Sequence, residues 1–149
     1  TTYNNYVSLL AGTSWDDVNV AGNEPLVDMA VIWYITSGKS SPTLSAPSYS
    51  SITGYYPFIS GWPSRNATIF DYKTSDNNLI TPAQFDAATN DSLLVAGFND
   101  GFTSGWCKYA LTGKVIPFKT SGGKYGLINI VRADENETGS MEIDIKVQK

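Results

Sequence analysis

Three segments near the end of the chain alternate hydrophobic and polar residues, which is the pattern of half-buried strands. They cover residues 114–119, 124–132 and 140–147, and a Ser-Gly-Gly turn and a polar loop separate them. In the last segment the hydrophobic side chains occupy every second position from Met141 to Val147. The pattern predicts an antiparallel meander with one buried and one solvated face.

The longest apolar run, LVDMAVIWYIT over residues 26–36, is rich in β-branched and aromatic residues and lacks glycine and proline. It predicts a central strand buried on both faces, with Trp33 and Tyr34 in the core. Asp28 lies inside this run, so its carboxylate must accept hydrogen bonds there or shift its pKa. Shorter strands are expected over residues 3–10, 66–72 and 92–98, and a turn over residues 12–17.

Residues 40–64 contain no charged side chain but include Pro42, Pro47, Pro57 and Pro63. The four prolines argue against a regular helix or a central strand through most of this segment. The segment also contains five aromatic rings. A long loop of this composition is typically an ordered functional loop or one that covers the core.

One helix start is well marked, at Thr81-Pro82-Ala83-Gln84. Thr81 can cap the helix, proline is tolerated at its first position, and Gln84 can complete a capping box. The helix is expected to end near Ala88. Together these elements predict one mainly β domain over residues 1–149, an antiparallel β-sandwich or rolled sheet with one or two short helices.

Composition narrows the chemistry that this chain can perform. Histidine is absent and Cys107 is the one cysteine, which excludes Ser-His-Asp and Cys-His catalytic sites, His-ligated metals and cysteine-cluster zinc sites. We expect the Cys107 side chain to be a small buried hydrophobe. Because ten basic residues are scattered among fourteen acidic ones, nucleic acid and anionic membrane surfaces are not expected partners. No apolar run is long enough to span a bilayer.

Carboxylates offer two candidate sites. A glycoside hydrolase needs two carboxyl groups across a cleft, and the sequence does not say which acids would pair. Calcium prefers carboxylate and amide oxygens, which Asp16-Asp17 and Asn99-Asp100 would supply, but no EF-hand spacing is present. Turn formation is the simpler role for these residues, and no cofactor is expected.

Aromatic side chains give the best candidate for ligand binding. Tyr55, Tyr56 and Trp62 lie in the uncharged loop, and Trp106 follows a second glycine-rich turn. Exposed tyrosine and tryptophan faces suit sugar rings or a protein partner. Packing in the core is the alternative role for each ring.

Several motifs together resemble one family of surface or periplasmic lipoprotein domains from Bacteroidetes. They are VDMAVIWY, SPTLSAPS, GWPSRNATIF, TPAQFDAATNDSLLVAGF and the ending GKVIPFKTSGGKYGLINIV with GSMEIDIKVQK. The final hairpin is also distantly similar to the last strands of HmuY-type haem-binding lipoproteins. The chain has no histidine for haem, and Met29 and Met141 lie in predicted strands. The resemblance implies an extracytoplasmic β domain with a lipid anchor upstream of Thr1, and it implies no catalytic residues.

We therefore expect a non-catalytic cell-envelope domain, in the periplasm or on the cell surface, that binds a glycan or a partner outer-membrane protein. Low charge, a single cysteine and a first residue other than methionine fit a mature exported chain. One alternative is a structural or accessory domain without a small-molecule ligand. Another is a two-carboxylate glycoside hydrolase. Two candidate rings exposed in one patch would favour a binding domain, and two acids facing each other in a cleft would favour the enzyme.

Overall fold

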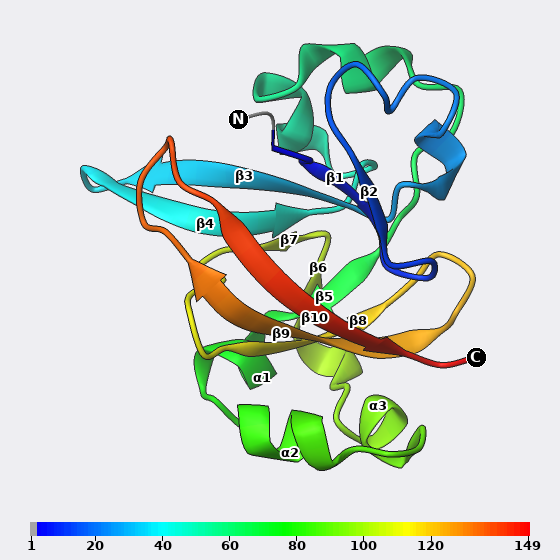
Figure 1. Cartoon of the computed structure of the whole chain (residues 1–149), viewed down its shortest axis with the longest axis vertical. Helices are drawn as coiled ribbons and strands as arrows, with labels where there is room; N and C mark the ends of the chain where they lie inside the picture. Colours follow the sequence, from blue (N-terminus) through cyan, green and yellow to red (C-terminus); the bar gives the residue numbers. More distant parts are fainter. Residues whose placement is uncertain (1–2) are drawn as a thin grey trace.

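A computed structural model describes residues 3–149 and shows two five-stranded antiparallel sheets packed face to face (Figure 1). In the first sheet the strand order is β2 (Thr13–Trp15), β1 (Tyr6–Ser8), β3 (Met29–Thr36), β4 (Lys39–Ser45), β7 (Trp106–Cys107). In the second it is β10 (Met141–Val147), β9 (Tyr125–Ala133), β8 (Val115–Lys119), β5 (Ile69–Asp71), β6 (Thr103–Ser104). The predicted mainly β, sandwich-like fold is confirmed.

Strand β3 lies in the middle of the first sheet and is buried on both faces over its first half. Met29 and Val31 point into the core between the two sheets, whereas Ala30 and Ile32 point into a second core on the outer side. Successive side chains of a strand point to opposite faces. An unbroken apolar run therefore serves both cores, as the sequence predicts.

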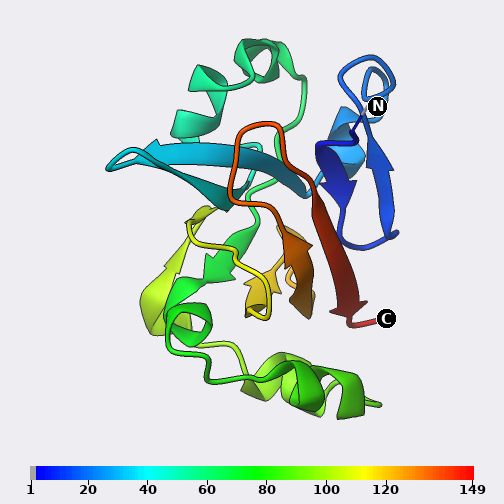
Figure 2. The ribbon, with the colours of Figure 1, turned by 60° about the vertical axis from the view of Figure 1, so that its left-hand side comes forward.

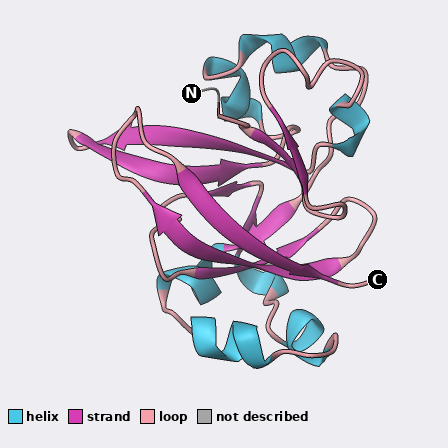
Figure 3. Cartoon of the chain, in the orientation of Figure 1, coloured by secondary structure: helices cyan, strands magenta, loops and turns pink. Residues whose placement is uncertain are grey.

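The outer face of the first sheet is covered by the proline-rich segment, which folds into two 3-10 helices (Figures 2 and 3). These are η2 (Ser50–Gly54) and η3 (Pro57–Gly61). Ile52 and Ile59 are fully buried there against Tyr6 and Ile32 of the sheet. Of the two roles expected for this segment, covering the core is thus established.

Three short α-helices cover the outer face of the second sheet (Figure 3). They are α1 (Tyr72–Asp76), α2 (Pro82–Ala87) and α3 (Ser92–Ala96). Phe85 and Leu94 pack there against Val115 and Leu127. Two further 3-10 turns are η1 (Glu24–Leu26) and η4 (Asp100–Phe102). Within residues 3–149, no helix has the length and apolar character needed to cross a membrane.

The C-terminal meander and the capped helix are both confirmed. Strands β8, β9 and β10 pair antiparallel in chain order, with Phe118 opposite Gly126. At the start of α2, Thr81 accepts from the backbone N–H of Gln84, and the Gln84 side chain accepts from the backbone N–H of Thr81. This is the capping box that the sequence predicts.

Two short segments differ from their predicted structure. Residues 92–98, predicted as a strand, begin with helix α3. Leu94 is the only residue of this run that is deeply buried, and a short helix that buries one apolar face satisfies that burial. Residues 12–17, predicted as a turn, contain strand β2, which pairs with β1 from Tyr6↔Trp15 to Ser8↔Thr13.

The prediction of no regular strand or α-helix through most of residues 40–64 holds from Ala46 on, whereas the start of the segment belongs to strand β4 between β3 and β7. Pro42 lies opposite Trp33, and its carbonyl accepts a hydrogen bond of 2.9 Å from the Ala110 N–H on the side away from β3. The N and C=O of one strand residue point to the same side. The missing N–H of Pro42 therefore removes no hydrogen bond from the β3–β4 ladder.

Candidate functional site

A groove follows the free edge of the outer half of β3. Strand β1 pairs only with Met29 and Ala30, so β3 beyond Val31 has no strand partner on this side among residues 3–149. The Val31 N–H donates to Asn5 O (2.9 Å) at this edge. Alternate residues of a strand direct their backbone groups to the same edge. Trp33 and Ile35 therefore present their N–H and C=O groups along the groove.

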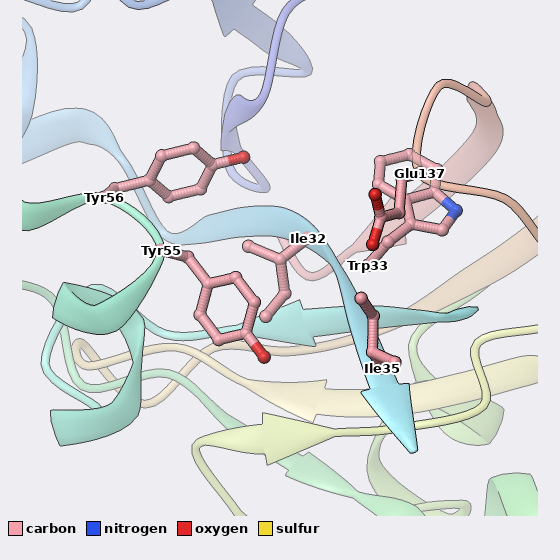
Figure 4. Close-up of a pocket in the computed structure, with 6 residues that line it drawn as sticks. All are labelled: Ile32, Trp33, Ile35, Tyr55, Tyr56 and Glu137. Atoms are coloured by element: carbon pink, nitrogen blue, oxygen red, sulfur yellow. The ribbon is translucent and has the colours of Figure 1, made fainter. Parts of the chain in front are cut away.

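One end of the groove is an open depression of about 360 Å³ with aromatic walls. Tyr55 and Tyr56 project from one side, Trp33 and Glu137 from the other, and Ile32 lies between them (Figure 4). These side chains come from β3, from the segment between η2 and η3, and from the β9–β10 loop. The pairing of two distant segments on either side of β3 creates the depression.

The groove continues into a second depression of about 510 Å³. Trp33, Tyr56 and Glu137 line both parts, so the two depressions lie side by side. The other lining residues of the second part are Tyr3, Asn5, Asp16, Asp17, Val18, Thr138 and Gly139. The groove thus passes from an aromatic end to a more polar one.

Trp33 is fixed by a contact between the two sheets. Its Nε1–H donates to the backbone carbonyl of Asp134 in the β9–β10 loop at 2.6 Å. The Asp134 carboxylate accepts from the Ser140 N–H (2.9 Å) and from Arg132 (3.0 Å). These bonds, that of Ser140 first, lower the pKa of the Asp134 carboxyl, which stays ionised and holds the loop that carries Glu137.

Tyr56 is held in the groove wall by its hydroxyl, which donates to the Val31 carbonyl at 2.8 Å. Its ring meets the buried Tyr6 ring edge-on, with 5.2 Å between centroids. Burial, followed by the nearby Asp17 charge, raises the pKa of the Tyr56 hydroxyl. The hydroxyl therefore remains a donor near neutral pH, and the half-buried ring is held rigid.

Tyr55 is the most exposed of the four candidate residues, with 40% of its surface accessible. Its ring lies 6.0 Å from that of Trp106, centroid to centroid, and projects beside Ile32 (Figure 4). It lines the aromatic end of the groove together with Tyr56. The structure thus brings these two candidates together at one surface.

Trp62 and Trp106 lie in the aromatic core under the 3-10 helices. Trp106 is 9% exposed, and Tyr49 stacks on its ring at 5.4 Å between centroids. Trp62 is half-buried and contacts Tyr6 edge-on at 5.7 Å. Neither residue lines the groove described above. Trp106 contacts the groove residue Tyr55 directly, whereas Trp62 is linked to Tyr56 through the ring of Tyr6.

Two acids of the polar end are held by hydrogen bonds. Asp17 accepts from the Tyr6 hydroxyl at 2.7 Å. Asp16 accepts from the backbone N–H groups of Asn19 (2.7 Å) and Val18 (3.0 Å), and these bonds, that of Asn19 first, lower the pKa of its carboxyl. In residues 3–149 no three His, Cys, Asp or Glu side chains gather as metal ligands would. Asp16 and Asn99, whose side chain accepts from the Gly101 N–H, act in turns.

Two residues that the sequence singled out lie outside the groove. Asp28 is 4% exposed, and its Oδ2 accepts from the Leu9 N–H at 2.9 Å. It is thus a hydrogen-bonded buried acid, as expected. Cys107 is fully buried, and burial raises the pKa of its thiol to about 12, which fits its expected role as a small hydrophobe.

Several groove residues, Trp33 and Glu137 among them, are absent from the set of candidates that the sequence suggested. Trp33 was assigned to the core, and Glu137 belongs to a polar loop with nothing to distinguish it from Glu135. Trp33 and Glu137 become neighbours only because the β9–β10 loop folds over β3. The end of the apolar run, where Ile35 becomes exposed, gives the one local sign of a surface there.

Comparisons with protein-family models, curated proteins and solved structures found no match to this chain. The resemblance to lipoprotein domains therefore stays a prediction.

Proposed function

We propose that the chain is a non-catalytic cell-envelope domain that binds a glycan in the groove along β3. The observation that carries the proposal is the placement of Trp33, Tyr55 and Tyr56 around one open depression. Composition and the lipoprotein resemblance support the envelope location.

The groove offers both kinds of contact that a sugar ring requires. Aromatic faces pack against the C–H face of a sugar, and their polar edges remain wet. The free backbone groups of Trp33 and Ile35 and the carboxylates of the polar end can exchange hydrogen bonds with hydroxyl groups. Since Trp33 and Tyr56 are already held by hydrogen bonds, binding would order few side chains.

Calorimetric titration with a panel of neutral oligosaccharides tests the proposal. We expect one class to bind, and Tyr55→Ala to weaken that binding about tenfold, as loss of one stacked ring implies. Tyr109→Ala is the matched control, because Tyr109 is 47% exposed and lies outside the groove. It should bind like the parent chain.

The same samples discriminate the alternatives. If the mixtures develop new reducing ends and Glu137→Gln stops this release, the chain is a glycoside hydrolase. If no oligosaccharide binds, the accessory-domain alternative replaces the proposal. Equal losses in Tyr55→Ala and Tyr109→Ala would show that the ligand binds somewhere other than this groove.

A further inference from the structure

Among residues 3–149, the charged side chains that line the groove all have one sign. Asp16, Asp17 and Glu137 line its second depression, and no lysine or arginine lines either part. The one ion pair in the described chain joins Arg132 to Asp134. No basic side chain of residues 3–149 therefore neutralises the three groove acids.

The acids also keep oxygen atoms available to a ligand. Asp16 receives its three hydrogen bonds on Oδ1, and Asp17 receives the Tyr6 hydroxyl on Oδ1. The Oδ2 atoms of both residues carry no hydrogen bond within the described chain. A ligand with hydrogen-bond donors could bond to these oxygen atoms, and a positively charged donor would bind them most strongly.

We propose that the groove selects a glycan carrying free amino groups, of the glucosamine type, over acidic glycans. This inference rests on the proposed function and specifies its ligand class. A protonated amino sugar places its ring against Trp33 and Tyr56 and its ammonium group near the carboxylates of Asp17 and Glu137, which line the same depression. Uronic acids would bring a carboxylate against three others.

Titration with two hexasaccharides isolates the charge, because glucosamine and N-acetylglucosamine hexamers share one backbone. At about 0.01 M salt we expect the glucosamine hexamer to bind about tenfold more tightly. At about 1 M salt, where the Debye length falls to about 3 Å, the two affinities should converge.

Charge-neutralising variants locate the effect. Glu137→Gln, and separately Asp17→Asn, which keeps an acceptor for the Tyr6 hydroxyl, should each weaken glucosamine-hexamer binding about threefold. Glu142→Gln is the control, since it changes net charge equally but lies exposed on β10 and lines neither depression of the groove. It should leave the affinity unchanged.

Equal affinity for the two hexamers at low salt, or tighter binding of a galacturonic acid hexamer, would overturn the inference and leave the proposed function intact. If neither hexamer nor any neutral oligosaccharide binds, both fail. If oligolysine binds and none of the glycans does, both proposals are likewise overturned, and the groove is a site for basic peptides.

Discussion

The buried carboxylate of Asp28 gives the sharpest test of how the first sheet is held together. Its Oδ2 accepts from the Leu9 N–H (2.9 Å) and, at 3.4 Å, from the Leu10 N–H and the Ser8 hydroxyl. Asp28→Ala would leave the buried Leu9 N–H without an acceptor. Lost acceptors of this kind cost about 1–3 kcal/mol each, so we expect a loss of about 2–3 kcal/mol.

For a chain of this length, that loss corresponds to a melting temperature lower by about 4–12 °C. Asp28→Asn keeps an oxygen acceptor of similar shape and should cost less than about 1 kcal/mol at neutral pH. The assay is urea unfolding of the three proteins, followed by tryptophan fluorescence, which gives the free energy of unfolding of each.

A pH series adds a second test. Burial raises the pKa of the Asp28 carboxyl, while the three hydrogen bonds lower it less. The folded state therefore binds the proton more tightly than the unfolded state, and ionisation costs stability above the folded-state pKa. The difference in unfolding free energy should shift in favour of Asp28→Asn as pH rises from about 4 to about 7.

Two results would refute this reasoning. Equal stability of Asp28→Ala and Asp28→Asn would show that the acceptor contributes nothing. The second concerns the difference in unfolding free energy between wild type and Asp28→Asn. If this difference is constant with pH, or if it favours wild type more as pH rises, burial does not dominate the pKa of Asp28.

The remaining predictions concern packing and thiol chemistry. Gly126→Ala should lower the melting temperature by several degrees, because its Cβ would overlap the Phe118 ring and lie 2.6 Å from the Lys146 carbonyl. Gly122→Ala, whose Cβ has only one atom nearby at 3.9 Å, is the control and should melt with the wild type. The Cys107 thiol, with its pKa raised to about 12 by burial, should resist a disulfide reagent at about pH 8 until urea unfolds the chain. Rapid labelling of the folded protein would contradict its burial.

The sequence predicted those elements whose signal is local. The β8–β10 meander, the strand buried on both faces and the capped helix each rest on periodicity or capping within about ten residues. Residues 92–98 lack such a signal, because a short apolar run fits a helix and a strand equally. Asp91 precedes the helix without making a side-chain capping hydrogen bond, so the packing of Leu94 under the second sheet decides the helix.

The candidate site could be predicted only in part, for a physical reason. Composition indicated that the aromatic residues of the proline-rich loop lie near one another. It did not indicate which of the candidate rings are exposed: Tyr55 is exposed, whereas Trp106 is buried. That division depends on which rings the outer face of the first sheet contacts. The Trp33–Glu137 wall depends on contacts between segments about a hundred residues apart, which no local pattern encodes.

The hydrogen bond from Trp33 to Asp134 has a consequence for how the chain matures. During synthesis β3 leaves the ribosome long before the β9–β10 loop exists, since 101 positions separate the two residues. Contacts between residues so far apart in sequence form slowly, and they stabilise the chain only late in folding. Nascent chains that lack the last two strands therefore lack the Glu137 side of the groove and the acceptor for Trp33, so the proposed glycan binding would require the completed chain.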